Sequence, residues 1–274
     1  MVTGSSEARV GPTLRELRKR RRLTQLELAL DAGISARHLS FVETGRSKPG
    51  REMLLRITEQ LDVPFRERNQ LLLAAGHAPA FPERSFNDPA LAPVREALDL
   101  ILTGHEPYPA VVVDRAWNLV AANSAVSALT ERVDIDPALL RPPVNVLRIG
   151  FHPRGLAPLL ANLGEWRAHF LERLERQVAI TGDQDLNALI EEVAGYPSPT
   201  PEHAPAVDPR ASPILGPIRI RAPDGSELSF FGMFATFETP FEVTTSELAI
   251  ELLFPADRPT AEALKNLARD RRRP

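Results

Sequence analysis

"LTQLELALDAGISARHLSFVETGRSKPG", residues 23–50, predicts two short helices joined by a tight turn. Thr24 has the chemistry of an N-cap, and Glu27 three residues later completes the capping-box pattern. Gly33 stands where a left-handed residue ends a helix, since glycine adopts a positive φ without a steric penalty. Ser35 offers a second N-cap, which begins the second helix. Local signals therefore predict a compact helix pair.

Upstream of this pair, the sequence predicts one more helix. We expect Gly11-Pro12 to precede it, with Leu14 and Leu17 on its inner face. Its outer face is expected to carry the cations Arg15, Arg18, Lys19, Arg20, Arg21 and Arg22. Apolar surface of the following helix is expected from Leu26, Leu28, Ala29 and Leu30.

Downstream of the pair, the helical pattern continues. Gly45 ends the second helix of the pair, and residues 53–61 and 71–75 lie in a fourth and a fifth helix. We therefore expect residues 1–80 to form an all-α domain of five helices.

Residues 81–106 are expected to form a linker, with an amphipathic helix from Pro93 to Leu102. Residues 107–274 mix strand and helix patterns, which favours an α+β domain. Two β-type runs lie on either side of Asp114-Arg115, and Asn123 is expected to cap the helix that follows them. The pattern of residues 144–151 leaves a strand and a buried helix open.

The rest of this domain is expected to contain two helices, a hairpin, a last strand and a final helix with a basic tail. Leu163, Trp166, Phe170 and Leu174 give an amphipathic helix, and a second follows at 186–193. Residues 197–217 hold seven prolines and are predicted to be a loop. The hairpin is expected to turn at Pro223-Asp224-Gly225, and the last strand lies within residues 246–257.

Composition narrows the class of protein. The 274 residues are 43% hydrophobic and 25% charged, which is ordinary for a globular protein, and the absence of cysteine excludes disulfides and thiolate zinc sites. Residues 1–80 hold 14 Lys and Arg against 9 Asp and Glu, whereas the remainder holds 19 against 27. A basic part on an acidic chain favours a polyanionic partner for that part alone. No apolar run indicates a membrane span and no leader indicates secretion, so we expect a cytoplasmic protein.

Two helices around a short turn favour a unit that reads duplex DNA with its second helix in the major groove. Leu39 and Val42 take the inner face of that helix, and Arg37 offers a fork for guanine. Gln25 lies where an amide and free N–H groups can bind phosphate. The predicted DNA contacts are Thr24, Gln25, Ser35, Ala36, Arg37, His38, Ser40, Phe41, Arg46 and Lys48. An ordinary helix pair with a charged, solvated face is the alternative.

The same stretch resembles the XRE-type, phage-repressor-like helix-turn-helix in Leu-Thr-Gln, Gly-Ile-Ser, Glu-x-Gly-Arg and a following proline. Phe41 departs from that pattern, because a polar base-reading residue is common there; it either touches a thymine methyl or packs on a neighbouring helix. The continuation to residue 123, and "NLGEWRAHFLERL", resemble MmyB-like regulators, in which an XRE domain is fused to a PAS-like ligand-binding domain. Residues 197–217 depart from that family, whose members usually carry a Trp and His segment there.

The resemblance implies that residues 107–274 bind an apolar, fatty-acid-like ligand. No other cofactor and no metal is expected, since the six histidines show no metal-ligand spacing. Candidate contacts are Trp117, Arg148, His152, Trp166, Phe170, Leu174, Phe231, Met233 and Phe234. Arg148, His152 or Arg154 is a candidate anchor for a carboxylate. The alternative is that these three face solvent and that most of the apolar residues are ordinary core.

Two other classes of function stay open at this stage. A small-molecule enzyme would need a convergent constellation, but the six histidines show no metal-ligand spacing and no nucleophile elbow or phosphate loop occurs. A protein-interaction adaptor would use the basic domain without binding DNA. We favour a homodimeric transcription regulator that binds double-stranded DNA and does not engage membranes, since half-sites one helical turn apart match a two-fold dimer.

Overall fold

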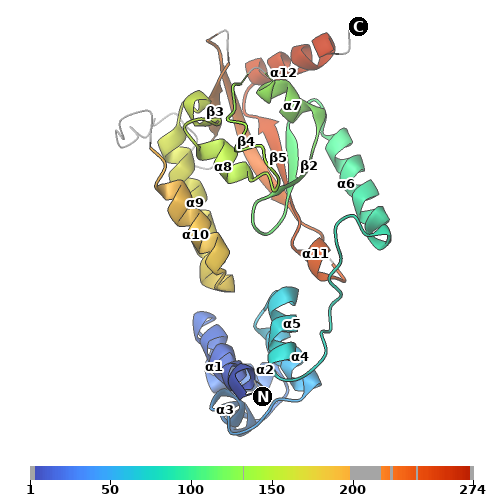
Figure 1. Ribbon diagram of the computed structural model, residues 1–274, viewed down its shortest axis with the longest axis vertical. Coiled ribbons are helices and arrows are strands. Elements are labelled where there is room, and N and C mark those ends of the chain that lie inside the picture. Colours follow the sequence, from blue (N-terminus) through green and yellow to red (C-terminus); the bar gives the residue numbers. More distant parts are fainter. Residues whose placement is uncertain (1–3, 132, 198–216, 223–224, 239, 272–274) are drawn as a thin grey trace. The chain divides into compact units, whose positions relative to one another are not determined.

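The computed structural model describes residues 4–131, 133–197, 217–222, 225–238 and 240–271 (Figure 1). Most of the predicted proline-rich loop, and Pro223 and Asp224 of the predicted hairpin turn, lie outside these residues. The chain divides into two compact units. The first is Met1–Ser85 with Gln177–Gly182 and Thr239–Ser246, and the second is Phe86–Arg176, Asp183–Glu238 and Glu247–Pro274.

The first unit contains the five helices predicted for the N-terminal part of the chain. They are α1 (Gly4–Arg20), α2 (Gln25–Asp31), α3 (Ala36–Glu43), α4 (Arg51–Gln60) and α5 (Phe65–Ala74). Apolar residues of all five helices form one core, whose most deeply buried members include Leu14, Leu28, Leu39, Leu54, Ile57 and Leu72. The all-α, five-helix architecture is confirmed.

The caps at the turn between α2 and α3 are those that the sequence predicts. The backbone N–H of Glu27 donates to Thr24 Oγ1 at 3.2 Å, and the N–H of Thr24 donates to Glu27 Oε2 at 2.7 Å. Ser35 Oγ accepts from the N–H of His38 at 3.1 Å. Gly33 has a φ of 63° after α2, which only a residue without a Cβ adopts readily.

The start of α1 corrects a sequence prediction. Gly11-Pro12 does not precede this helix but lies inside it. A Cβ on Gly11 would lie only 2.3 Å from the carbonyl oxygen of Val42, so glycine is needed here for close packing of α1 on α3. Burial of Val10 and Leu14 on both sides of the exposed Pro12 holds the helix together through the proline.

The apolar surface of α2 also differs from the expectation. Leu28 and Ala29 are buried, whereas Leu26 and Leu30 are 71% and 78% exposed. A helix turns by about 100° per residue, so positions two before and two after Leu28 point away from the stripe that Leu28 and Ala32 form. The core needs only that one stripe.

The second unit is built on a five-stranded antiparallel sheet. Its strands are β1 (Ala110–Val113), β2 (Leu119–Ala122), β3 (Ile218–Arg221), β4 (Glu227–Ala235) and β5 (Ala249–Pro255), in the order β2-β1-β5-β4-β3. The two β-runs around Asp114-Arg115, the hairpin strands and the last strand are therefore where the sequence places them.

Helices cover both faces of this sheet (Figure 1). Leu98 and Leu102 of α6 (Ala92–Gly104) pack with Ala110, Val112 and Ile250 on one face. The other face carries α8 (Val146–Phe151), α9 (Leu163–Thr181) and α10 (Gln184–Ala194). The second unit also contains α7 (Ser124–Thr130), α12 (Arg258–Arg271) and the short 3-10 helices Pro89–Leu91 and Ala157–Leu159, whereas α11 (Val243–Ser246) belongs to the first unit. The α+β class is confirmed, and the segment left open between strand and helix contains the helix α8.

Asn123 does not cap α7 with its side chain, contrary to the sequence prediction. Its Oδ1 accepts from the N–H of Ala110 at 3.1 Å, and its Nδ2 donates to the carbonyls of Leu102 and Tyr108. Glu106 takes the capping role instead, because its Oε1 accepts from the N–H of Ser124 at 2.9 Å. Asn123 thus joins the end of α6 to the start of β1.

Candidate functional site

Helix α3 packs on the first unit by one stripe and exposes another. Leu39 and Val42 are buried at 0% and 1% exposure, and Ala36 packs against the same core. Arg37 is exposed, while His38 and Ser40 are half-buried. The helix is therefore fixed by its apolar side and presents a polar side that a groove of DNA could receive.

A buried ion pair connects α1 with the end of α3. Arg18 Nε and Nη2 donate to the two carboxylate oxygens of Glu43 at 2.7 and 2.9 Å. Gln25 Nε2 donates to Glu43 Oε2 at 2.7 Å. Burial acts to raise the pKa of Glu43, but the hydrogen bonds from Arg18 and Gln25 outweigh it, so the pKa lies below its ordinary value. All three side chains are held in fixed positions.

This network changes two assignments made from sequence. Arg18 was expected on the outer, cationic face of α1, yet it is only 8% exposed because Glu43 draws it inward. Gln25 was expected to bind phosphate, and one of its amide N–H groups is already donated to Glu43. A phosphate contact through the other N–H of Gln25 stays a prediction.

Arg37 and Phe41 lie one turn apart on α3 and contact each other. The guanidinium carbon of Arg37 lies 5.4 Å from the centroid of the Phe41 ring, within cation–π range. Phe41 is half-buried. The aromatic residue that departs from the XRE pattern is thus placed to orient the arginine fork beside it.

The other predicted DNA contacts have varied surroundings. The hydroxyls of Thr24 and Ser35 serve as helix caps. His38 Nε2 lies 3.5 Å from Ser47 Oγ. Arg46 and Lys48 are exposed just after α3, where cations would meet a flanking backbone.

In the second unit, four predicted ligand contacts meet on the α9 side of the sheet. Ring centroids of Trp117 and Phe170 lie 5.2 Å apart, those of Trp117 and Phe234 5.6 Å, and those of Trp166 and Phe170 4.9 Å. Phe151, which the sequence did not single out, packs against Phe170 at 5.8 Å. We call these five residues, Trp117, Phe151, Trp166, Phe170 and Phe234, the aromatic cluster. Leu174 is fully buried on the same helix as Phe170.

Two predicted ligand contacts, Phe231 and Met233, lie on the opposite face of the sheet. Met233 pairs with Leu252, a residue of the α6 face, and is 53% exposed. Phe231 stacks on Phe254 with the centroids 5.3 Å apart. Alternate residues of a strand point to opposite faces, so neither side chain can share a pocket with Phe234. The alternation of residues along β4 could therefore have predicted that Phe231 and Met233 lie on the face opposite Phe234.

The three predicted carboxylate anchors already have partners in the protein. Arg148 makes a bidentate pair with Glu192, at 2.9 Å from Nε and 2.8 Å from Nη2. Arg154 pairs with Asp136, and His152 Nδ1 accepts from the N–H of Arg154 at 3.1 Å. An anionic ligand would have to displace a carboxylate from either arginine.

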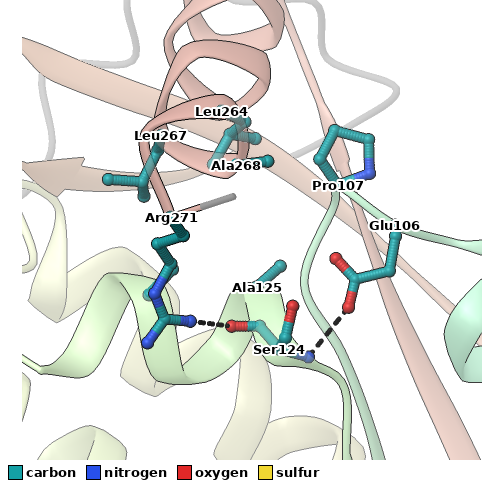
Figure 2. Close-up of a pocket in the computed structure, with 9 residues that line it drawn as sticks. Glu106, Pro107, Ser124, Ala125, Leu264, Leu267, Ala268 and Arg271 are labelled. Atoms are coloured by element: carbon teal, nitrogen blue, oxygen red, sulfur yellow. Dashed lines mark hydrogen bonds between the residues drawn. The ribbon is translucent and has the colours of Figure 1, made fainter. Parts of the chain in front are cut away.

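A cavity of about 430 Å³ lies between α7 and α12 (Figure 2). Arg271 Nη1 donates to the carbonyl of Ser124 at 2.9 Å at its edge. The lining residues are Glu106, Pro107, Ser124, Ala125, Ala128, Leu264, Leu267, Ala268 and Arg271. None of the predicted ligand contacts belongs to this cavity.

The described part of the chain shows neither a metal-binding cluster nor a membrane-spanning helix. In that part of the chain, no group of three or more His, Asp or Glu side chains is placed to hold a metal ion. Its helices also include none with the length and apolar character that crossing a membrane requires.

Comparison with known proteins identifies relatives of both units. Residues 94–267 match the family described as the MmyB-like transcription regulator ligand binding domain, and residues 14–68 match a helix-turn-helix family. The uncharacterized HTH-type transcriptional regulator RghRB of Bacillus subtilis (strain 168) is 34% identical over 127 residues, which are 46% of this chain and 83% of that protein.

Two solved structures show partial likeness. The clp gene regulator ClgR from Corynebacterium glutamicum is 24% identical over 37% of this chain and 95% of its own, with a TM-score of 0.23. An RNA-binding light-oxygen-voltage receptor is 12% identical over 96% of this chain and 63% of its own, with a TM-score of 0.25.

Proposed function

The chain belongs to the MmyB-like transcription regulators, and from this premise we propose that it is a sequence-specific DNA-binding protein whose second unit senses an apolar, fatty-acid-like ligand. A helix-turn-helix joined to a ligand-binding domain, and a regulator as relative, point to a DNA-binding transcription regulator and not to an enzyme. The proposal assigns residues 1–80 to DNA, 81–106 to a linker and 107–274 to the ligand.

One observation supports the DNA-reading part most strongly. Leu39, Val42 and the Glu43 network hold the inner side of helix α3 against the first unit. The helix exposes Arg37 on its opposite side. An arginine fork on a rigid helix binds guanine O6 and N7 through two parallel hydrogen bonds. We assign base reading to Arg37, Ser40, His38 and Phe41, and phosphate contacts to Arg46 and Lys48.

The test compares how Arg37→Ala and Arg46→Ala change the affinity of the protein for a duplex selected from a random library. Arg37→Ala is expected to lower affinity for the selected duplex by about 1–3 kcal/mol and to relax discrimination at one base pair. Arg46→Ala is the matched comparator, and it should weaken binding to all sequences alike. Equal losses on every sequence from Arg37→Ala would reassign this residue to phosphate.

The ligand part rests on family membership and on the aromatic cluster. The cluster gathers large rings from α8, α9, β4 and the turn after β1. Trp117, Phe151 and Phe170 are buried, whereas Trp166 and Phe234 are partly exposed and would shelter an aliphatic chain from water. Ligand binding changes DNA affinity only if the ligand prefers one arrangement of the protein over another. We propose that such a preference connects the two units of a homodimer acting on a pseudo-palindromic site in the cytoplasm.

A protein-interaction adaptor is the alternative function, and it predicts a different result in the duplex measurement. An adaptor with a basic helical unit would bind a protein and show no affinity for duplex DNA, even at low salt. Native mass spectrometry of the purified chain would report the subunit number and any copurified lipid together. A monomer would remove the dimer from the proposal, whereas the duplex measurement would still decide whether the chain binds DNA.

A further inference from the structure

Arg173 on α9 is a half-buried cation without a hydrogen-bonding partner in the described part of the chain. Its guanidinium carbon lies 3.5 Å from the ring centroid of Phe234 and 5.8 Å from that of Trp117. Burial lowers the pKa of Arg173. The negative charge of Glu251 acts to raise this pKa, and the positive charge of Arg176 acts to lower it further. The five N–H donors of an arginine are costly to leave unpaired where water is partly excluded.

Glu251 is the carboxylate that faces Arg173. It stands on the central strand β5, and its cross-strand neighbours on the same face are Val111 on β1 and Phe234 on β4. A Cβ on Gly232 would lie 3.6 Å from Glu251 Oε1, which shows how closely β4 approaches the carboxyl group. No described residue donates a hydrogen bond to this carboxyl group.

The charges around Glu251 are few. Strands β1 and β4 offer it only apolar neighbours, and α9 offers Arg173, with Arg176 acting on Arg173 in turn. Burial therefore raises the pKa of Glu251 to about 7, against the opposing effect of Arg173. Near neutral pH, Arg173 faces a carboxyl group that is ionised only part of the time.

We propose that Arg173 and Glu251 form the headgroup site of the second unit, in which Arg173 binds the carboxylate of an acidic apolar ligand. This inference rests on the proposed function, because it names the chemistry of that same ligand. Arg173 offers unused donors at the edge of the aromatic cluster, whereas Arg148 and Arg154 are occupied by Glu192 and Asp136.

The site accounts for both ends of such a ligand. The guanidinium fork of Arg173 pairs with the two carboxylate oxygens, and protonated Glu251 donates its O–H to one of them. The aliphatic chain then runs along the aromatic cluster. When Glu251 ionises it competes for Arg173 and repels the ligand, so affinity falls as the pH rises through about 7.

The two tryptophans of the chain both belong to the aromatic cluster, so intrinsic fluorescence reports on the site directly. We would titrate the delipidated full-length protein with dodecanoate and with dodecanol at about pH 6. We expect the acid to bind about ten to a hundred times more tightly than the alcohol, because only the acid forms a charge-assisted hydrogen bond with arginine. Arg173→Gln should abolish this preference, and Arg176→Gln, an exposed change on the same helix, should retain it.

The pH dependence of dodecanoate affinity provides a second readout, and Glu251→Gln should change it only if Glu251 takes part in binding. The wild type should bind dodecanoate more weakly at about pH 8 than at about pH 6, while the variant should bind equally at both. This comparison, and the preference for acid over alcohol in the wild type, remain decisive if Arg173→Gln fails to fold.

The outcomes distinguish failure of the headgroup site from failure of the apolar sensor. Equal binding of acid and alcohol by the wild type, or an acid preference retained in a folded Arg173→Gln protein, would overturn the headgroup site and leave an apolar sensor standing. Binding of neither dodecanoate nor dodecanol would overturn the headgroup site together with the fatty-acid-like ligand.

Discussion

The two units each place a carboxylate against an arginine, but they do so in opposite ways. Glu43 receives hydrogen bonds from Arg18 and Gln25, and its pKa is lowered despite burial. Glu251 receives none from the described residues, and burial raises its pKa. The first arrangement fixes the position of α3, whereas the second leaves a charge that a ligand can complete. Under the proposed function, the fixed geometry of the first unit serves DNA reading, and the incomplete pairing in the second unit serves the response to a ligand.

Removing the Glu43 carboxylate should produce the largest effect. Glu43→Ala leaves Arg18 buried without its partner, and breaking a buried ion pair in this way costs about 3–5 kcal/mol. Hydrogen exchange of the α1–α5 amides in the full chain would measure the loss. Glu52→Ala, an exposed change on α4, is the control and should alter protection little. Equal behaviour of the two variants would show that the network does not hold α3.

The pH dependence of the second unit should be nearly as large. The pKa of Glu251 is raised from 4.5 to about 7, so the folded state binds more protons than the unfolded state between these values. Stability should therefore fall by up to about 3 kcal/mol as the pH rises through this window. Urea unfolding followed by tryptophan fluorescence would measure the change, which Glu251→Gln should remove and Glu172→Gln, an exposed change on α9, should not.

The first unit should respond to acid in the opposite direction. Because the pKa of Glu43 is lowered in the folded protein, its stabilising contribution is complete above the ordinary pKa and is lost as the pH falls below it. Acid should thus strengthen the sheet unit between about pH 7 and 4.5, and it should open α1–α5 in hydrogen exchange only below that window. Loss of both units at one acidic pH would contradict the contrast between them.

Packing of α1 on α3 gives a prediction of intermediate size. Gly11→Ala would place a Cβ 2.3 Å from the Val42 carbonyl, and such overpacking costs about 1–3 kcal/mol. Gly50→Ala is the matched control, because nothing lies within 4 Å of a Cβ there. Thermal unfolding of the full chain should separate the two variants, and a neutral Gly11→Ala would show that α1 approaches α3 less closely.

The smallest expected effect concerns the ring beside the arginine fork. Phe41→Ala removes the cation–π contact with Arg37, which is worth about 0.5–1 kcal/mol at exposed sites. Affinity for the selected duplex should fall about two- to fivefold, and Phe41→Trp should restore it. If Phe41→Ala instead changes preference at one thymine position, the ring reads the methyl group and does not position Arg37.

Local signals allowed the helical unit to be predicted, and long-range contacts explain where the prediction failed. Thr24, Glu27, Gly33 and Ser35 act on their immediate neighbours, so their roles follow from spacing. Arg18 was misplaced because Glu43 lies 25 residues away along the chain. The sequence contains no local mark of that pairing.

The ligand face shows the same limit. The rings of α9 were predicted from helical spacing, but Arg173 was not, although it lies three residues after Phe170 on a largely apolar face. Glu251 within the apolar run of β5 was a second overlooked signal. Strand alternation alone would have separated Phe231 and Met233 from Phe234. The approach of Arg173 to Glu251, by contrast, depends on how α9 crosses the sheet.

The central claim is that the polar side of α3 binds a groove of double-stranded DNA, and a salt titration of duplex affinity tests it most directly. Each phosphate contact releases counterions, so the logarithm of the association constant should fall linearly with the logarithm of salt concentration, with a slope near −0.9 for each phosphate neutralised. We expect steep dependence for the selected duplex and weaker affinity for unrelated sequences. Absence of any duplex affinity at low salt, with α1–α5 folded, would contradict the account.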